Sequence, residues 1–393
     1  MHVLIAGGGI GGLAAGLALT REGHRVEVFE QASEWSELGA GVQLGPNASR
    51  LFSDWGLAAS LQAIAAAPRQ LGVRRLADGA QLARLRLGEP MRRRYGAPYL
   101  TVHRGDLHAL LVQAARTSGA TLHLDRRVAQ VEPRGDGVGL VFTNGGRADG
   151  DILVGADGIW SAVRQALWGD GSAQPTGHVA YRALVRQTAL PVAMRSRDVR
   201  VWMGTLAHVV AYPVRRGEWL NVVAIVEGGR PGATRDWDQH GDSTALVAAL
   251  GRIEPDLAAL VHAAPTWRLW SLHARPPLQG PATMARGRAA LLGDAAHPML
   301  PYLAQGAAMA LEDAAELADA LRQGQPEAAD PVPALQRYAQ NRWARCARVQ
   351  RGARRNGVIF HAAGPARWGR DLALRLLGAR LLDQPWLYGG RTH

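Results

Sequence analysis

A histidine and a tyrosine stand four residues apart in the segment His208-Val-Val-Ala-Tyr212-Pro. Residues i and i+4 of a β-strand project from the same face of a sheet, so both side chains can reach one bound ligand. An imidazole accepts a proton near neutral pH, and a phenol donates or accepts a hydrogen bond. The pair could therefore remove a proton from a hydroxyl group and orient that group. The spacing alone favours a simpler interpretation, in which both are ordinary strand residues.

Three other charged side chains occur at the ends of expected elements. Arg104 opens an amphipathic segment that is expected to be helical to about residue 118. Asp157 and Asp294 each end a short apolar run with the pattern of a buried strand. An aspartate at a strand end is most often a cap or turn residue, and a lone arginine is commonly a surface charge. Their order along the chain makes them candidates for ligand binding.

The first thirty residues fit two different structures. The uncharged run 3–19 has glycines at every fourth position, as packed membrane helices do. A membrane helix needs about 20 apolar residues, however, and a secretory signal needs a basic segment before the apolar run. The alternative is a strand over 2–6, a glycine turn, a helix over 13–21 and a second strand over 25–30. We favour this second interpretation, because it explains the glycines and the strand that follows as well as the apolar run.

The glycine turn has the pattern G-x-G-x-x-G, formed by Gly7, Gly9 and Gly12. In dinucleotide-binding proteins the first glycine makes a tight turn, the second lets the backbone approach a pyrophosphate, and the third packs helix against strand. Glu30, at the end of the second strand, is placed to bind ribose hydroxyls. Its carboxylate would repel a 2′-phosphate, so we predict binding of FAD or NAD rather than NADP, in an α/β fold.

The middle and end of the chain are predicted to add a β-rich part and further helices. Alternating β-branched residues predict strands over 198–203, 208–212 and 219–225, with a hairpin over 213–218. Helices are expected over 244–250 and 255–262, where they would cover one face of the sheet. Residues 330–393 are arginine-rich and helical in pattern, and we expect them to serve packing or homodimer contacts.

Composition narrows the class of protein. The chain has 393 residues and a net charge of +12, and all 45 basic residues are arginines. They are scattered, without interleaved aromatic residues, so we expect no nucleic-acid partner. The single cysteine, Cys346, excludes an intrachain disulfide framework and is expected to be a structural thiol. The 13 histidines show no ligand spacing, so we predict no metal site. We also expect no membrane segment and a cytoplasmic location.

The order of these motifs resembles that of the group A FAD-dependent aromatic hydroxylases, the superfamily of para-hydroxybenzoate hydroxylase. The resemblance covers residues 1 to about 321, and the stretches 39–48 and 293–301 are most similar to the salicylate and 3-hydroxybenzoate 6-hydroxylase branch. It implies a Rossmann-like FAD-binding domain interleaved with a β-rich substrate domain. The implied domains are FAD-binding at 1–70, 100–170 and 280–325, substrate-binding at 71–99 and 171–279, and C-terminal helices at 326–393.

The resemblance also assigns cofactor contacts, for FAD bound non-covalently. Asp294 is expected to bind the ribityl chain and Arg104 to contact the pyrophosphate side. Val128, at the end of a strand expected over 122–128, is expected to touch adenine through its backbone. Asp157 is expected in the turn linked to the FAD phosphates and to NAD(P)H. The segment Gly306-Ala307 opens a helix, and a helix N-terminus suits the negative charge of a reduced flavin.

The same resemblance implies the reaction. NADH or NADPH reduces FAD, and the reduced flavin reacts with O2 to a C4a-hydroperoxide that hydroxylates a small aromatic substrate, such as a phenolic acid or a hydroxybenzoate- or hydroxypyridine-like compound. His208 is then expected to help deprotonate the phenol and Tyr212 to position it. Pro301 and Tyr302 are expected to line the substrate pocket. This chain lacks the polar residue that related 3-hydroxybenzoate enzymes have at Pro301 and the histidine that hydroxynicotinate hydroxylases have at Tyr302.

A related possibility is an epoxidase or a quinone-precursor hydroxylase with a larger substrate, but no apolar docking segment in the C-terminal region favours it. Two functions of other classes are compatible with the same FAD-binding motifs. One is a flavin-dependent dehydrogenase or reductase that does not use O2 as a substrate, and the other is a non-enzymatic flavoprotein that binds an aromatic ligand. The sequence has no second G-x-G-x-x-G, which suggests that NAD(P)H visits transiently instead of occupying its own domain. An arginine would suit the carboxylate of a benzoate-like substrate. The sequence does not choose between Arg182 and the other arginines.

Overall fold

The computed structural model describes residues 1–36, 41–228, 239–323 and 330–390, which form two compact units. Each unit is assembled from three separate stretches of chain. The first unit contains Met1–Glu37, Gly105–Gln174 and Ala274–Ala353, and the second contains Leu38–Arg104, Pro175–His273 and Arg354–His393. The division by ligand that the sequence predicts stays a prediction, because compactness does not say what each unit binds.

The first unit is built on a sheet whose strand order is β18-β19-β11-β1-β2-β7. All neighbours are parallel except β18 and β19. Strands β1 and β11 are buried on both faces, as parallel strands with uninterrupted apolar sequences usually are. In this order the strands span Ala285–Arg286, Ala289–Leu291, Ile152–Gly155, His2–Ala6, Arg25–Phe29 and Thr121–His123.

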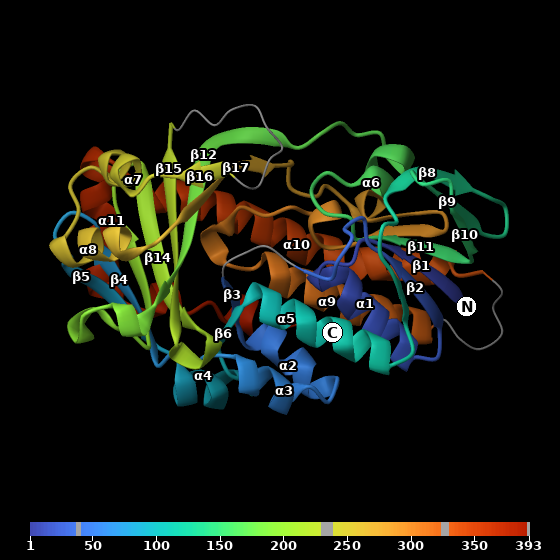
Figure 1. Ribbon diagram of the computed structural model, residues 1–393, viewed down its shortest axis with the longest axis horizontal. Coiled ribbons are helices and arrows are strands. Elements are labelled where there is room, and N and C mark those ends of the chain that lie inside the picture. Colours follow the sequence, from blue (N-terminus) through green and yellow to red (C-terminus); the bar gives the residue numbers. More distant parts are fainter. Residues whose placement is uncertain (37–40, 229–238, 324–329, 391–393) are drawn as a thin grey trace. The chain divides into compact units, whose positions relative to one another are not determined.

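Helices α1 (Ile10–Arg21) and α9 (Gly306–Gln323) lie side by side on this sheet (Figure 1). Small residues permit their close approach, since a Cβ at Gly11 would lie 3.2 Å from the Cβ of Ala310 on α9. The unit also contains a three-stranded antiparallel sheet, β10-β9-β8. The other elements are α5 (Arg104–Thr117), β8 (Val128–Pro133), β9 (Val138–Phe142), β10 (Arg147–Gly150), α6 (Ala162–Leu167) and α10 (Val332–Phe360), of which α5 and α10 continue into the second unit.

The second unit is built on an eight-stranded sheet of order β16-β17-β12-β15-β14-β13-β4-β5. Strands β12, β15, β14 and β13 are antiparallel to one another, whereas β13 and β4 are parallel. In this order the strands span Gln239–Gly241, Trp267–Ala274, Gln174–Arg186, Trp219–Glu227, Ala207–Val214, Val199–Met203, Gln70–Arg75 and Gln81–Arg86.

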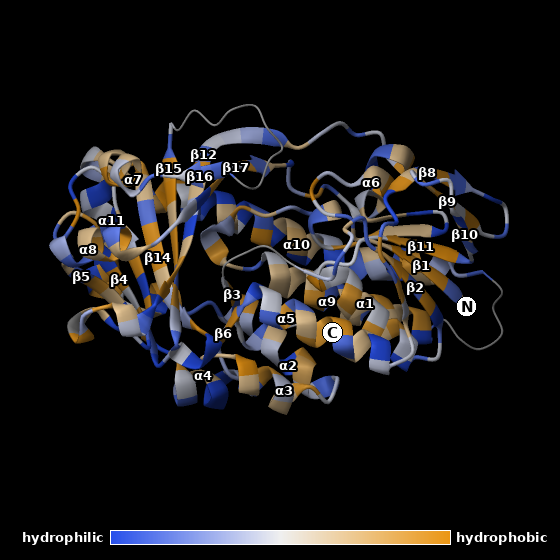
Figure 2. Ribbon diagram, in the orientation of Figure 1, coloured by the Kyte–Doolittle hydropathy of each residue, from blue (hydrophilic) through white to orange (hydrophobic). Residues whose placement is uncertain are grey.

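One face of this sheet is covered by helices α7 (Ser243–Leu250) and α8 (Pro255–Ala263). Alternate strand residues such as Val209 and Val222 pack there against helix residues such as Leu246. Figure 2 shows the apolar character of β14 and β15 and of the β1 and β2 strands in the first unit. The remaining elements of the second unit are β3 (Gly41–Leu44), α2 (Pro46–Asp54), α3 (Ala58–Ile64), α4 (Gly88–Tyr95), β6 (Leu100–His103), α11 (Gly364–Leu377), α12 (Ala379–Leu382) and α13 (Pro385–Tyr388).

The predicted fold class is confirmed: a parallel sheet, separate β-rich sheets and C-terminal helices are all present. The strand expected over 122–128 is wrong, because β7 ends at His123 and Val128 begins a different strand, β8. Asp125, which has a φ of +54°, interrupts the extended backbone between them. The segment expected to be a hairpin at 213–218 is shorter, since β14 continues through Val214. In the part of the chain that the structure describes, no helix combines the length and apolarity that a membrane crossing requires.

Candidate active site

The glycine turn has the tight geometry that the sequence predicts. Gly7 has a φ of +105°, and a Cβ on it would lie 2.4 Å from the carbonyl oxygen of Ala156. A Cβ on Gly12 would lie 1.9 Å from the carbonyl oxygen of Gly7. Gly9 is the N-cap of α1 and has ordinary extended backbone angles, and no side chain caps the helix there. The first amides of α1 can therefore donate to an anion.

Glu30 lies beside this turn, as expected for a residue that follows β2. Its carboxylate accepts hydrogen bonds from the backbone N–H groups of Gly8 at 2.8 Å and Ala32 at 2.9 Å. A ring nitrogen of His108 on α5 lies 2.8 Å from the carbonyl oxygen of Gly8. A carboxylate can accept about four hydrogen bonds, so these two amides leave capacity for ribose hydroxyls.

The two predicted aspartates differ in their surroundings. Asp157 is partly buried: it accepts hydrogen bonds from the hydroxyl of Ser161, the N-cap of α6, and from the N–H of Val163 in the first turn of that helix. Burial raises the pKa of Asp157 even though these donors oppose that shift. Asp294 is exposed in a turn whose neighbours Gly293 and Ala295 are buried. Asp294 is therefore the residue of this turn that a cofactor can reach, whereas Asp157 positions the loop that follows β11.

The other predicted cofactor and pocket residues come from separate segments. Arg104 is partly buried at the start of α5, and Val128 is partly buried at the start of β8. Pro301 and the buried Tyr302 form a 3-10 turn, and Ala304 after it has a left-handed φ of +52°. Strained non-glycine residues of this kind gather at functional sites. Helix α9 then starts at Gly306 and Ala307. Gly39 and Ala40, the first residues of the stretch 39–48 that resembles the relatives, lie outside the described residues.

The first unit fits a bound dinucleotide by its own geometry. The crowding at Gly7 and Gly12 leaves no room for side chains, and the uncapped start of α1 presents amides where a pyrophosphate would lie. Glu30 and Asp294 add carboxylate oxygens that can accept hydrogen bonds from hydroxyl groups. Together these features form a cradle suited to FAD.

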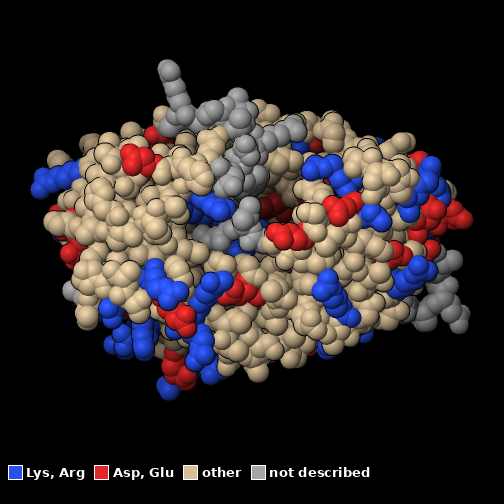
Figure 3. Space-filling model, in the orientation of Figure 1, with Lys and Arg blue, Asp and Glu red and all other residues tan. Residues whose placement is uncertain are grey.

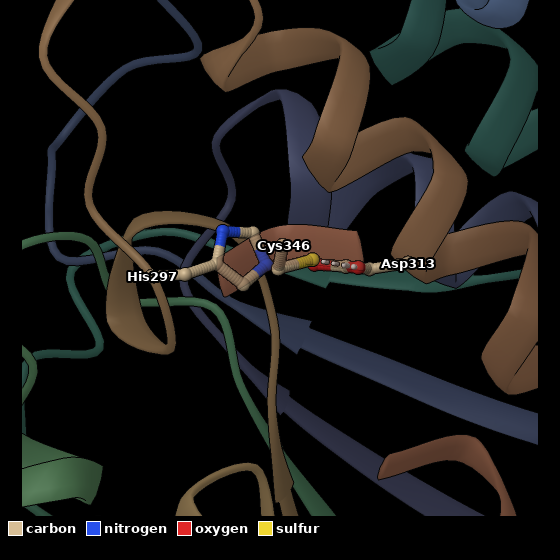
Figure 4. A group of neighbouring side chains, drawn as sticks. All are labelled: His297, Asp313 and Cys346. Atoms are coloured by element: carbon tan, nitrogen blue, oxygen red, sulfur yellow. Dashed lines mark hydrogen bonds and ion pairs between the residues drawn. The ribbon is translucent and has the colours of Figure 1, made fainter. Parts of the chain in front are cut away.

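A buried charge network, which the sequence does not reveal, supports the Asp294 turn, and Figure 4 shows three of its members, His297, Asp313 and Cys346. Asp313 on α9 accepts hydrogen bonds from the Gly293 N–H at 3.0 Å and from His297 Nε2 at 2.5 Å. Its other oxygen accepts from Arg342 Nε on α10 at 2.7 Å. The thiol of Cys346 lies 3.7 Å from the same oxygen. Asp313 therefore connects the Asp294 turn, by hydrogen bonds, to α9 and α10.

The ligand atoms of His297, Asp313 and Cys346 lie within 4.8 Å of one another, a spacing that could hold a cation. Arg342 already pairs with Asp313 and, at 2.7 Å, with Glu312. Burial by itself lowers the pKa of His297, but Cys346 and Asp313 raise it well above its usual value. The two carboxylates are thus neutralised by protein cations, and we interpret the group as a structural ion-pair network.

The face of the eight-stranded sheet opposite α7 and α8 carries the predicted catalytic pair. Residues paired across neighbouring strands point to the same side, and so do residues two apart. Tyr212 pairs with Asn221, and Val210, two residues before it, pairs with Val223, which pairs in turn with Arg182. His208, Tyr212, Asn221 and Arg182 therefore project from one face, called here the polar face. The expectation that His208 and Tyr212 share a face is confirmed.

His208 is buried in a cluster of histidines. Its Nδ1 lies 2.8 Å from Nε2 of His361 in the C-terminal region, and the ring of His178 stacks on His361 at 5.4 Å. Burial, followed by the neighbouring imidazoles, lowers the pKa of His208 well below its usual value. His208 is consequently neutral at pH 7, which is the form that accepts a proton.

This cluster predicts acid sensitivity. The pKa values of His178, His208 and His361 are all lowered by burial in the folded state, to about 4 for His361. A lowered histidine pKa means that protonation favours the unfolded state, so stability is complete above pH 6.5 and is lost as the pH falls toward 4. We expect His361 alone to cost about 2 kcal/mol between pH 7 and pH 5. Urea unfolding at both pH values should show this loss, and His361→Gln should reduce it; an unchanged loss in that variant would contradict the assignment.

Comparison with known proteins places the chain in a family. Residues 1–353 match the family model described as FAD binding domain. The 3-hydroxybenzoate 6-hydroxylase of Polaromonas naphthalenivorans is 38% identical over 393 residues, covering 99% of this chain and 96% of that protein. The chain belongs to the FAD-binding-domain family, and within it to the group A aromatic hydroxylases. It is a flavoprotein monooxygenase whose cofactor is FAD.

Two solved structures are similar over nearly the whole chain. Klebsiella pneumoniae HpxO, complexed with FAD and uric acid, has a TM-score of 0.84 and 26% identity, covering 97% of this chain and 94% of that one. A salicylate hydroxylase in a substrate complex has a TM-score of 0.83 and 26% identity, covering 99% and 95%. Both likenesses extend through the C-terminal helices, beyond the 1–321 that the motifs suggest.

Proposed function

We propose that this enzyme hydroxylates a small phenolic acid, of the hydroxybenzoate or hydroxypyridine-acid type, with NAD(P)H as reductant and O2 as oxygen donor. The observation that carries the proposal is that His208 and Tyr212 project from the same polar face, in a chain similar over 99% of its length to a hydroxybenzoate hydroxylase. A proton acceptor and a phenolic hydroxyl on one face suit a substrate that reacts as its phenolate.

One set of residues would bind the cofactor, and another set would bind and deprotonate the substrate. FAD, when bound, supplies the redox chemistry that amino-acid side chains lack. Gly7, Gly9 and Gly12 would admit its pyrophosphate, with Glu30 on the ribose and Asp294 on the ribityl chain. The other contacts proposed are Arg104 near the pyrophosphate, the backbone of Val128 near adenine, the Asp157 loop near the phosphates and NAD(P)H, Gly306 and Ala307 near the flavin ring, and Pro301 and Tyr302 in the substrate pocket.

His208 would accept the phenol proton, and Tyr212 would position the substrate oxygen. The neighbouring His361 offers a second imidazole along which a proton can move away from the site. A neutral His208 is needed for this step, and its lowered pKa keeps it neutral across the physiological range. A phenolate is more electron-rich than a phenol, so proton removal speeds oxygen transfer to the ring.

A His208→Ala variant is expected to hydroxylate about 100-fold more slowly while still binding FAD, because proton transfer by a positioned base contributes at least that factor. Product formation should recover at high pH, where the phenol ionises without help. His262→Ala, an exposed histidine on α8, is the matched control and should leave the rate unchanged. An unaltered hydroxylation rate in His208→Ala would remove His208 from the mechanism.

The proposal as a whole is tested by a screen of hydroxybenzoates and hydroxypyridine acids. Substrate-stimulated NAD(P)H oxidation, oxygen uptake and product analysis should identify at least one acid that yields a ring-hydroxylated product. NAD(P)H oxidation without oxygen incorporation for every compound would contradict the proposed substrate class.

A further inference from the structure

Arg182, in the middle of β12, lies on the polar face without a carboxylate partner in the described part of the chain. Its guanidinium carbon lies 3.9 Å from the ring centroid of Trp270, so the side chain is stacked on the indole. Its Nε is buried and has no hydrogen-bond partner among the described residues. Stacking on an aromatic face fixes the plane of a guanidinium but does not neutralise its charge.

The buried arginines of the described residues are paired with carboxylates, whereas Arg182 is partly buried. Arg164 and Arg275 bind Asp170, Arg342 binds Glu312 and Asp313, and Arg370 binds Asp371. Burying a cation without a counter-charge is unfavourable. Burial lowers the pKa of Arg182 to about 10, which still leaves it charged at pH 7. Arg182 therefore differs from this group in having a charge that no described protein carboxylate neutralises.

Asn221, on the neighbouring strand β15, supplies a second unsatisfied donor on the polar face. Its side-chain oxygen accepts a hydrogen bond from the Gly41 N–H at 2.9 Å, which fixes the orientation of the amide. The amide nitrogen is then left buried with no partner among the described residues. Buried polar groups of this kind are uncommon in folded proteins and call for an explanation.

Tyr212 lies beside both groups. Its ring packs on Gly41 so closely that a Cβ there would lie 2.5 Å from Cε2 of the tyrosine. Tyr212 pairs directly with Asn221 across the strands, and the charge of Arg182 opposes the rise that burial causes in the pKa of Tyr212. A guanidinium, an amide and a phenol thus present donors on one face of one sheet.

We propose that Arg182, stacked on Trp270, binds the carboxylate of the aromatic substrate, with Asn221 as an accessory donor and Tyr212 left to the phenolic oxygen. The inference rests on the proposed function and adds to it a selection rule: the site takes ring acids and discriminates against neutral phenols. The planar guanidinium fork matches a carboxylate, and an anion in this place satisfies the charge that the protein leaves unpaired.

The test is binding of ring acids to the FAD-loaded enzyme, followed by the change in flavin absorption. Benzoate, 3-hydroxybenzoate and 4-hydroxybenzoate are each compared with the corresponding neutral amide. Wild-type enzyme should bind the best acid at least 10-fold more tightly than its amide. Arg182→Met should weaken acid binding about 100-fold and amide binding less than threefold, since a charge-assisted hydrogen bond is lost only for the acid. Arg182→Lys should restore part of the preference.

Arg186→Met is the matched control. Arg186 lies on the same strand and is also stacked on a tryptophan, at 4.9 Å from the ring centroid of Trp219, but it is exposed. This variant should keep the preference for acids. The KM for NAD(P)H should also be unchanged in Arg182→Met, which separates a substrate carboxylate from the pyrophosphate of the co-substrate as the bound anion.

The inference is overturned if no ring acid binds the wild-type holoenzyme, if Arg182→Met weakens acid and amide equally, or if only the KM for NAD(P)H rises. Failure of the proposed function has a different result. Acids would then bind in an Arg182-dependent manner, but no ring-hydroxylated product would form. Thermal unfolding and flavin content of each variant show whether a loss of binding comes from misfolding.

Discussion

The Gly12→Ala enzyme is expected to purify colourless, with FAD affinity reduced at least 100-fold. The added Cβ would lie 1.9 Å from the carbonyl oxygen of Gly7, which is backbone and cannot rotate away. Gly7 itself packs against the backbone of Ala156 and Asp157, so it cannot move away from the new side chain. The turn must open, and the amides at the start of α1 then leave their positions. The absorbance ratio at 280 and 450 nm, with titration of added FAD, measures the effect.

Gly16→Ala provides the control on the same helix. The nearest atom to a Cβ there is a methyl group of Val28 at 3.1 Å, which a small side-chain movement can accommodate. Alanine also has the higher helix propensity, by about 1 kcal/mol. This variant should be yellow and at least as stable as the wild type. A yellow Gly12→Ala enzyme of normal FAD affinity would refute the assignment of the turn to the pyrophosphate.

Arg342→Met is expected to lower the free energy of unfolding by about 3–5 kcal/mol, because it leaves Glu312 and Asp313 buried without their shared cation. Both carboxylates are fully buried in the structure, and Arg342 bonds to each at 2.7 Å. Denaturant unfolding of the holoenzyme measures the change. FAD should also dissociate more readily, since Asp313 holds the Gly293 N–H next to Asp294.

Arg345→Met is the comparison, because Arg345 pairs with Glu312 from a more exposed position on the same helix. Its loss should cost markedly less than the loss of Arg342. The combined variant Arg342→Met with Asp313→Asn should recover part of the stability, since one uncompensated charge is removed with the cation. Equal, small effects of Arg342→Met and Arg345→Met would show that the network adds little to stability.

Much of the fold could be predicted because its signals are local. The first thirty residues contain the turn at Gly7–Gly12, strand β2 and Glu30. A side chain at Gly7 or Gly12 would collide with backbone atoms, so any chain that forms this turn needs glycine there. Helices α7 and α8 and strands β13, β14 and β15 follow from short periodic patterns. The residue pair His208 and Tyr212 shares a face because strand geometry requires it.

The parts that could not be predicted depend on residues distant in the chain. His208 meets His361 across 153 residues, and no local pattern marks that contact. Arg342 is one of many arginines, and only packing shows that it lies between two buried carboxylates. Arg182 is distinguished by the lack of a described carboxylate partner, which no sequence pattern encodes. The strand break after His123 was missed because 122–128 retains an alternating composition.

The strand order of the first unit has a consequence for biosynthesis. Strand β1 lies in the middle of the sheet, but it pairs with β11, where Val3 is opposite Ile152. Strand β11 pairs on its other side with β19, which is near residue 290. A growing chain therefore exposes apolar strand edges until about three quarters of it has left the ribosome, and such edges invite aggregation. Since the Asp294 turn follows β19 directly, uptake of the cofactor is expected to come late, after the nascent sheet has closed.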